Sequence, residues 1–154
     1  MSDMGTFRID IEVENPVIPG ARRVVSNALV DTGAELTWVP ADVLEALGVE
    51  RYTQWHFRQA NGTRLERWVG SAFVYVNGRR TADDVVFGEP GDPVLLGARS
   101  LEGLNLRVEP ATRRLVDAGP APAAGAALNC RVEGRGLGRE TIARTFTRLM
   151  AEFN

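Results

Sequence analysis

The stretch from Ala28 to Pro40 constrains the fold more than any other part of the chain, because an apolar run there ends on an acidic residue. Three apolar residues lead directly into Asp31-Thr32-Gly33, and apolar residues resume at Leu36. We expect such a carboxylate at the end of a strand within a core, where burial disfavours its charged form. Gly33 permits a sharp turn or a close approach by another chain, and the Thr32 hydroxyl suits a buried polar network. The same tripeptide is common turn chemistry, so by itself it also fits a plain turn after a strand.

A second apolar stretch, from Val94 to Leu101, complements the first. Within it, Leu95-Leu96-Gly97 precedes a short helical pattern. Asp-Thr-Gly followed later by two large apolar residues, a glycine and a short helix resembles the retropepsin-like (retroviral-type) aspartic proteases, in their single-domain bacterial form. The resemblance extends over roughly Phe7 to Val116.

The resemblance implies a role for each part of the two motifs. Asp31, Thr32 and Gly33 match the family's catalytic motif, and Ala34 and Glu35 follow where that family contacts substrate. In that family the second segment passes the first in a loop shaped like the letter psi, beneath the catalytic aspartate. Leu95, Leu96 and Gly97 would then be structural residues of the psi loop.

Peptide hydrolysis in this class needs two carboxylates that share one proton. The chain has a single Asp-Thr-Gly, and its other aspartates lack the setting of an apolar strand followed by glycine. The second aspartate would therefore be Asp31 of an identical chain across a two-fold axis. The resemblance thus implies a homodimeric aspartic endopeptidase that acts on a peptide or protein, with neither a metal nor an organic cofactor.

Two positions depart from the retroviral pattern. Glu35 stands where retroviral members often have an aspartate, and Ala98 follows Gly97 where an arginine is common. Arg99 comes one residue later. An ion pair between Glu35 and Arg99 could therefore replace the usual brace between the two motifs.

A hairpin is predicted around Asn61-Gly62, because alternating runs on both sides of an Asn-Gly pair favour a tight turn between two strands. Nothing in the hairpin indicates chemistry by itself, and a purely structural role stays open. Its place between the two motifs matches the family's flap, so the resemblance implies that Asn61 and Gly62 bind substrate. His56 is the only histidine, and it lacks the partners that a catalytic or metal role would need.

The remaining pattern predicts short strands and few helices. Apolar residues alternate with polar ones before the turn at Asn15-Pro16, and Arg22 to Val30 forms the return strand. A short helix is expected after Pro40, with Gly48 at its end. Further expected strands cover 70–76, 83–87, 106–108 and 114–116. The fold class is therefore all-β, a closed barrel or sandwich with one or two short helices.

Composition divides the chain into three parts. Residues 1–117 are expected to form the protease protomer, and the Ala/Pro/Gly-rich residues 118–127 form a linker. Residues 128–154 form a tail in which apolar residues recur at helical spacing, as in an amphipathic helix. The apolar residues of this helix are Ile142, Phe146, Leu149, Met150 and Phe153.

Charge and composition restrict the partners. The net charge is −2 with a pI near 5.5, which does not favour a nucleic acid or an anionic membrane as a partner. All 18 basic residues are arginine, so Schiff-base and P-loop lysines are absent. The single cysteine, Cys130, excludes an internal disulfide, and no signal peptide or membrane span is apparent. We therefore expect a cytoplasmic protein.

Two alternatives to an enzyme remain open at this point. The fold could be a catalytically silent module for binding or dimerisation that retains Asp31 without turnover. The chain could also be a regulatory piece of a larger assembly that docks through its C-terminal helix. The intact Asp-Thr-Gly favours the enzyme, because a scaffold does not need a desolvated acid.

Overall fold

The computed structural model describes residues 7–123. The chain divides into two compact units, Met1–Ala118 and Gly119–Asn154, and every helix and strand given below belongs to the first. The predicted amphipathic helix and Cys130 lie outside the described residues. The division into protomer, linker and tail stays a prediction.

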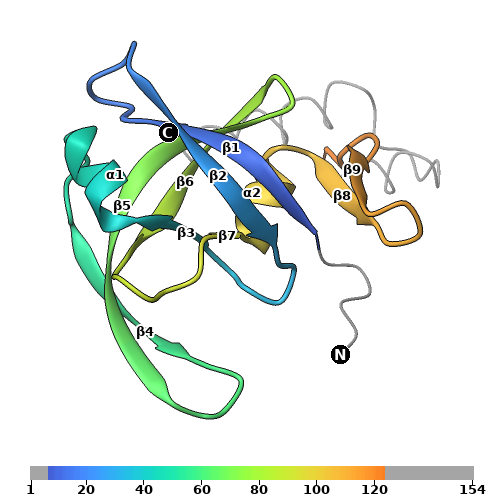
Figure 1. The fold of residues 1–154 in the computed structure, drawn as a ribbon. Coiled ribbons are helices and arrows are strands. Elements are labelled where there is room, and N and C mark those ends of the chain that lie inside the picture. The colour runs from blue at the N-terminus through green and yellow to red at the C-terminus, as the bar shows by residue number, and fades with distance from the viewer. Residues whose placement is uncertain (1–6, 124–154) are drawn as a thin grey trace, which may run out of the picture. The chain divides into compact units, whose positions relative to one another are not determined.

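Seven strands form one sheet in the order β1-β2-β7-β3-β6-β5-β4, and two more form a separate hairpin, β8-β9 (Figure 1). β1 also pairs with the long strand β5, so the sheet curls until it partly closes on itself. The strands are β1 (Arg8–Glu14), β2 (Arg22–Val30), β3 (Thr37–Pro40), β4 (Thr53–Arg58), β5 (Arg64–Val76), β6 (Arg79–Gly88), β7 (Leu95–Leu96), β8 (Leu106–Glu109) and β9 (Arg114–Asp117). The fold is all-β, as predicted.

The inward side chains of the strands make the core. Ile11 and Val13 of β1 are fully buried against residues of β2, β5 and β6, as the alternation in the sequence predicts. A second apolar cluster forms around Trp38 on β3 and Leu95 on β7. This second cluster lies beside the predicted catalytic loop and forms part of the wall of the site.

Two strands differ from the prediction. β5 runs unbroken through Gly70, where separate segments were expected. The glycine at this position leaves room for the segment after the first helix, which packs closely against the strand. A Cβ at Gly70 would lie only 2.9 Å from side-chain atoms of Val49 and Phe87. β3 was not predicted at all. Its residues 37–39 are buried, so the alternation that reveals a half-buried strand is missing.

The two helices among residues 7–123 are short and lie where the sequence places them. α1 (Ala41–Ala46) begins after Pro40, and the chain leaves it through Gly48, which has a φ of +75°. α2 (Ala98–Gly103) begins directly after Gly97. No helix among residues 7–123 is long and apolar enough to cross a membrane.

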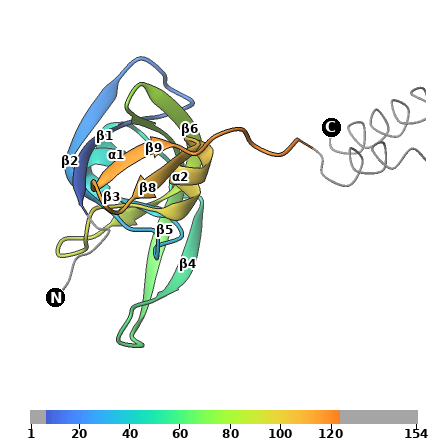
Figure 2. The same ribbon diagram turned by 90° about the vertical axis from the view of Figure 1, so that its right-hand side faces the viewer.

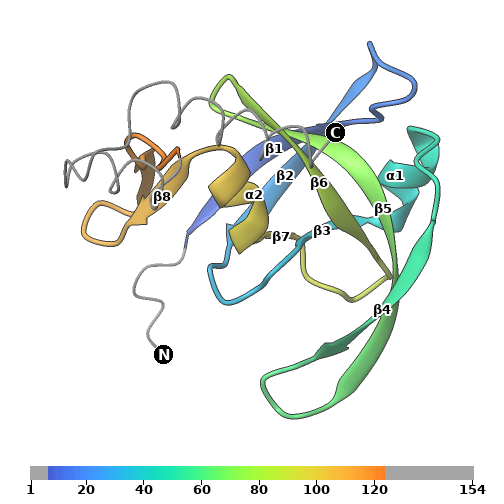
Figure 3. The ribbon, with the colours of Figure 1, turned by 180° about the vertical axis from the view of Figure 1, so that it is seen from behind.

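The sheet brings the two sequence motifs together. β7 pairs in parallel with the end of β2, with Leu29 opposite Leu95 and Val30 opposite Leu96, and β3 flanks β7 on its other side (Figure 3). The β4–β5 hairpin extends away from the rest of the sheet (Figure 2). The site therefore forms between the ends of β2 and β7 and the inner face of this hairpin.

Candidate active site

Asp31 is the first residue after β2, and its backbone is held on both sides. Its N–H donates to the carbonyl oxygen of Leu96 over 3.0 Å, and its own carbonyl oxygen accepts from Ala34 over 3.2 Å. The side chain is fixed as well, because the Gly33 N–H donates to Asp31 Oδ1 over 2.9 Å. The turn thus orients the carboxylate before any ligand binds.

Two expectations about this turn are corrected. Asp31 is only half-buried in the single chain, and Thr32 and Gly33 are exposed. The Thr32 hydroxyl therefore does not enter a buried network within the described chain. The physical reason is that β2 ends at the edge of the core, so the turn projects beyond the strands that bury Val30.

The second motif packs directly under this turn, and Gly97 permits the contact. The N–H groups of Ala98 and Arg99 donate to the carbonyl oxygens of Ala34 and Glu35 over 2.8 and 3.0 Å. A Cβ on Gly97 would lie 2.5 Å from the Leu36 carbonyl carbon and 3.0 Å from the Ala34 oxygen. The φ of Gly97 is an ordinary −93°, so the glycine is required by close approach of the backbones.

Glu35 and Arg99 form the ion pair that the sequence suggested. Arg99 Nη2 lies 2.7 Å from Glu35 Oε2, and its Nη1 lies 3.6 Å from Asp84 Oδ2. The guanidinium also sits 5.4 Å from the centre of the Trp55 ring. Both partners of the 2.7 Å pair are more than two-fifths exposed, so the pair orients the two segments without adding much to the free energy of unfolding.

A cleft of about 830 Å³ opens between the Asp31 turn and the β4–β5 hairpin. Its wall on the turn side includes Asp31 and Glu35, and aromatic rings dominate much of the rest. Trp38 and Phe57 are in contact at 5.0 Å between ring centres, and Trp55 stacks on Phe57 at 6.0 Å. The cleft therefore combines a positioned carboxylate with a large apolar surface, which suits an extended ligand with bulky side chains.

The structure brings most of the predicted site residues to this cleft, but not all of them. Besides the two acids, Gly33 and Ala34 of the first motif line it. Thr32 does not, and neither do Asn61 and Gly62. The aromatic wall was missed as part of a site, although the alternation of Trp55 and Phe57 along β4 already placed them on one face.

The predicted Asn-Gly hairpin is present, with the turn where the sequence placed it. Gln59 donates to the Thr63 carbonyl oxygen over 2.8 Å, and Gly62 has a φ of +87°. The hairpin register places Phe57 opposite Leu65 and Trp55 opposite Arg67. Gln59 and Ala60 reach the cleft. Closure of this hairpin over a substrate stays a prediction.

His56 alternates with the partly buried Trp55 and Phe57 along β4, and it also lines the cleft. Its Nε2 lies 3.4 Å from Glu66 Oε2 on the opposite strand of the hairpin, and its side chain is exposed. Within residues 7–123, no group of three or more His, Cys, Asp or Glu side chains could hold a metal ion.

A bidentate ion pair fastens the base of the hairpin. Arg67 Nε and Nη2 donate to the two carboxylate oxygens of Asp92 over 2.7 and 2.9 Å, and both side chains are less than one-sixth exposed. The hydrogen bonds from Arg67 are the main reason that the pKa of Asp92 is below its ordinary value near 3.8. The Glu89 N–H adds to this lowering, while burial opposes it.

We expect Asp92→Asn to lower the free energy of unfolding by about 1 to 3 kcal/mol at neutral pH, because the buried Arg67 loses its charged partner. A lowered pKa stabilises the fold above the ordinary value and loses that effect as the pH falls through the lowered one. The difference between wild type and variant should therefore shrink below about pH 4. Urea unfolding across the pH range measures it, and a difference that does not change with pH would contradict the assignment.

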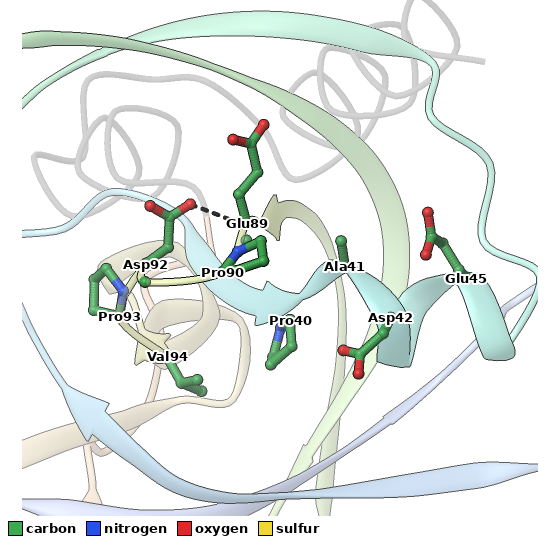
Figure 4. A pocket seen from close by; sticks show the side chains of 11 residues that line it. Pro40, Ala41, Asp42, Glu45, Glu89, Pro90, Asp92, Pro93 and Val94 are labelled. Carbon is green, nitrogen blue, oxygen red and sulfur yellow. Dashed lines mark hydrogen bonds between the residues drawn. The ribbon is translucent and has the colours of Figure 1, made fainter.

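A second cavity, of about 500 Å³, lies between α1 and the loop that leads into β7 (Figure 4). Asp42, Glu45, Glu89 and Asp92 contribute carboxylates to its wall. Glu45 pairs with Arg51 at 2.6 Å, and Asp92 accepts from the Glu89 backbone over 2.8 Å. Asp31 does not line this cavity, so it is not the candidate active site.

No protein-family model matches the chain, and no curated protein matches it. Among solved structures, it is similar to the solution structure of the Simian Foamy Virus (mac) protease, with 25% identity over 60% of this chain and 91% of that chain, at a TM-score of 0.41. It is also similar to the foamy viral protease-reverse transcriptase in complex with an RNA/DNA hybrid, with 13% identity over 95% of this chain and 17% of that chain, at a TM-score of 0.43. Both TM-scores are low, and neither similarity decides what this chain does.

The chain's own features define the fold. A partly closed β-sheet carries Asp-Thr-Gly at the end of one strand, and Leu-Leu-Gly passes beneath it. The described residues thus form an all-β fold in which the two sequence motifs meet, as predicted.

Proposed function

We propose that the chain is one subunit of a homodimeric aspartic endopeptidase. The observation that carries the proposal is the position of Asp31, whose fixed carboxylate faces a cleft of about 830 Å³ beneath a hairpin. The aromatic wall of Trp38, Trp55 and Phe57 suits the apolar side chains of a peptide or protein substrate.

In the proposed reaction the two Asp31 side chains share one proton, because two negative charges at close range are unfavourable. The charged carboxylate takes a proton from a water molecule, whose oxygen attacks the peptide carbonyl carbon. The protonated partner donates to the carbonyl oxygen, which gives a tetrahedral intermediate. Proton transfer to the amide nitrogen then allows the C–N bond to break, and the pair returns to its starting state.

The need for a second copy follows from the acids that line the cleft. Among the described residues, Glu35 is the other carboxylate on its wall, and Arg99 binds it at 2.7 Å. Because Arg99 pairs with its carboxylate, Glu35 is not free to form a shared-proton pair with Asp31. The exposed edge at Thr32 and Gly33 offers a surface on which a second chain could bring its own Asp31 close.

A catalytically silent module for binding or dimerisation is the alternative. It would keep the same fold and the same cleft. The oriented Asp31 carboxylate favours the enzyme, because a binding module has no need to hold an acid toward its cleft. We also propose that the enzyme acts in the cytoplasm, since its single cysteine needs no oxidising compartment.

A subunit-mixing assay tests the shared site. Wild type at a fixed concentration is allowed to exchange subunits with a tenfold excess of Asp31→Asn, and cleavage of a peptide library is measured. If each site needs two Asp31 residues, mixed dimers are inactive and the rate should fall to roughly one-tenth. An unchanged rate would contradict a shared site, provided that native mass spectrometry shows that the subunits have exchanged.

A further inference from the structure

The tip of the β4–β5 hairpin carries two arginines that face each other. Arg58 is the last residue of β4, Arg64 is the first residue of β5, and the two are directly opposite in the hairpin register. Both residues are exposed, and residues 59–63 between them are uncharged. Figure 2 shows this tip at the far end of the hairpin, away from the rest of the sheet. The tip therefore presents two positive charges without a negative one.

Neither guanidinium group is neutralised within the described part of the chain. No described carboxylate lies within ion-pair distance of Arg58 or Arg64. The acid that the hairpin itself supplies, Glu66, lies 3.4 Å from His56 Nε2 instead. The third arginine of the hairpin, Arg67, is bound by a carboxylate at the base. The two arginines at the tip thus differ from the one at the base in lacking an anion.

The arrangement at the tip is unfavourable without a ligand, because like charges directly opposite each other on paired strands repel. Hydrogen bonds in the turn keep the two strands together. The Gln59 N–H donates to the Thr63 carbonyl oxygen over 2.8 Å, and the Thr63 N–H donates to Asn61 Oδ1 over 2.9 Å. An anion bound by both guanidinium groups would remove the repulsion and gain charge-assisted hydrogen bonds. The tip is therefore suited to an anionic ligand.

The position of the tip relates this ligand to the cleft. Arg58 lines the cleft together with Gln59 and Ala60, and the Asp31 turn forms another part of the wall. A guanidinium group matches the planar geometry of a carboxylate, which is the anion that a peptide side chain supplies. The charge of Asp31 disfavours an acidic side chain at the scissile bond itself. The acidic residue would therefore bind farther along the peptide.

We propose that Arg58 and Arg64 are specificity-determining residues, which bind an acidic side chain of the peptide substrate away from the scissile bond. The substrate class is then a peptide that combines bulky apolar side chains, for the aromatic wall of the cleft, with an aspartate or glutamate. The proposal rests on the proposed function for its effect on cleavage, whereas the binding of peptides tests the two arginines without turnover.

The first test measures peptide binding to the full chain with Asp31→Asn, so that no cleavage occurs. A fluorescent peptide with an apolar centre carries one glutamate, which is moved through successive positions, and each peptide is compared with its glutamine counterpart. At one position or more, the glutamate peptide should bind roughly fivefold more tightly at low ionic strength. The preference should largely disappear in about 0.5 M salt, because the tip is exposed. Equal affinities at every position would overturn the proposal.

Substitution of each arginine shows whether the preference comes from the tip. Arg58→Gln and Arg64→Gln should each reduce the preference for glutamate, and the double variant should abolish it. Arg107→Gln is the matched control, because it removes the same charge from an exposed arginine on β8 that does not line the cleft. The control should keep the wild-type preference. A preference that survives in the double variant, or that falls equally in the control, would overturn the proposal.

Charge reversal gives a sharper readout. Arg64→Glu places a carboxylate opposite Arg58, so the midpoint of thermal unfolding should rise while the preference for glutamate is lost. A lower midpoint would mean that the two arginines do not repel each other, which would overturn the proposed site. Reversal of both charges, with Arg58→Glu and Arg64→Glu together, should make a lysine peptide bind better than its glutamate counterpart. Failure to invert the preference would overturn direct contact with the acidic side chain.

Cleavage by the wild type separates this proposal from the proposed function. The value of kcat/KM for the glutamate peptide should exceed that for its glutamine counterpart by roughly the same fivefold factor, mainly through a lower KM. Equal cleavage of the two peptides at every position would overturn the role of the arginines and leave the proposed function intact. Selective binding of the glutamate peptide without any cleavage would overturn the proposed function and leave the arginine site intact.

Discussion

Asp31→Asn should abolish peptide hydrolysis and leave the fold intact. The substitution keeps the volume of the side chain, and the amide oxygen can still accept from the Gly33 N–H. It removes the charged base and the shared proton together, and we expect kcat to fall by roughly a thousandfold or more. A peptidase assay with matched circular dichroism spectra measures both parts of this expectation.

The matched control for this experiment is Glu35→Gln, which changes the other acid on the same wall of the cleft. Its carboxylate pairs with Arg99, so its loss should weaken activity without abolishing it. Activity of Asp31→Asn within about tenfold of wild type would rule out an aspartic protease mechanism, because general acid–base catalysis alone contributes more than that. Binding of a peptide without turnover in the wild type would instead favour the silent module.

Gly97→Ala should cost at least about 3 kcal/mol of the free energy of unfolding, since a methyl group there would overlap the backbone of the first motif. The neighbouring atoms belong to the Leu36 carbonyl group and the Ala34 oxygen, which cannot rotate away as a side chain would. Activity should be lost in parallel, because the loop that bears Asp31 must shift. Urea unfolding and a peptidase assay on the same preparation test the two effects.

Gly88→Ala is the matched control, because it also adds one methyl group to a glycine next to backbone atoms. There the nearest atom, the Val39 oxygen, would be 3.2 Å away, so a small shift is enough. We expect a loss of about 1 kcal/mol or less. Similar losses for the two variants would mean that the close crossing of the two motifs is not the reason for the glycine at position 97.

The parts of the fold that could be predicted are those with a local signal. The strand from Arg22 to Val30 was expected with the bounds that the structure shows. The hairpin around Asn61-Gly62 was expected from its turn chemistry and is present. β3 could not be predicted, because its first three residues are all buried and therefore show no alternation. The sequence also could not show that Thr32 is exposed, since exposure depends on which strands end beside it.

The contact between the buried hydroxyl groups of Thr37 and Ser100 illustrates a different limit. Thr37 and Ser100 are separated by 63 positions, and no pattern in either segment marks them as partners. Their contact depends on the strand order that places β3 between β7 and β6, with α2 beside them. The fold also does not establish the role of each residue. The assignment of Asp31, Thr32 and Gly33 as catalytic and of Asn61 and Gly62 as substrate-binding stays a prediction.

The ion pair between Arg67 and Asp92 has a mechanical consequence for the hairpin. The pair ties β5 to the loop that leads into β7, and the hairpin residues beyond Arg67 extend away from this contact. We expect the hairpin to bend mainly next to the Arg67–Asp92 pair. Movement of the hairpin tip near Gln59 would therefore pull on Asp92 through Arg67. Asp92 lies three residues before Leu95. Movement of the hairpin toward the cleft would therefore be transmitted to β7, the strand that supports Asp31.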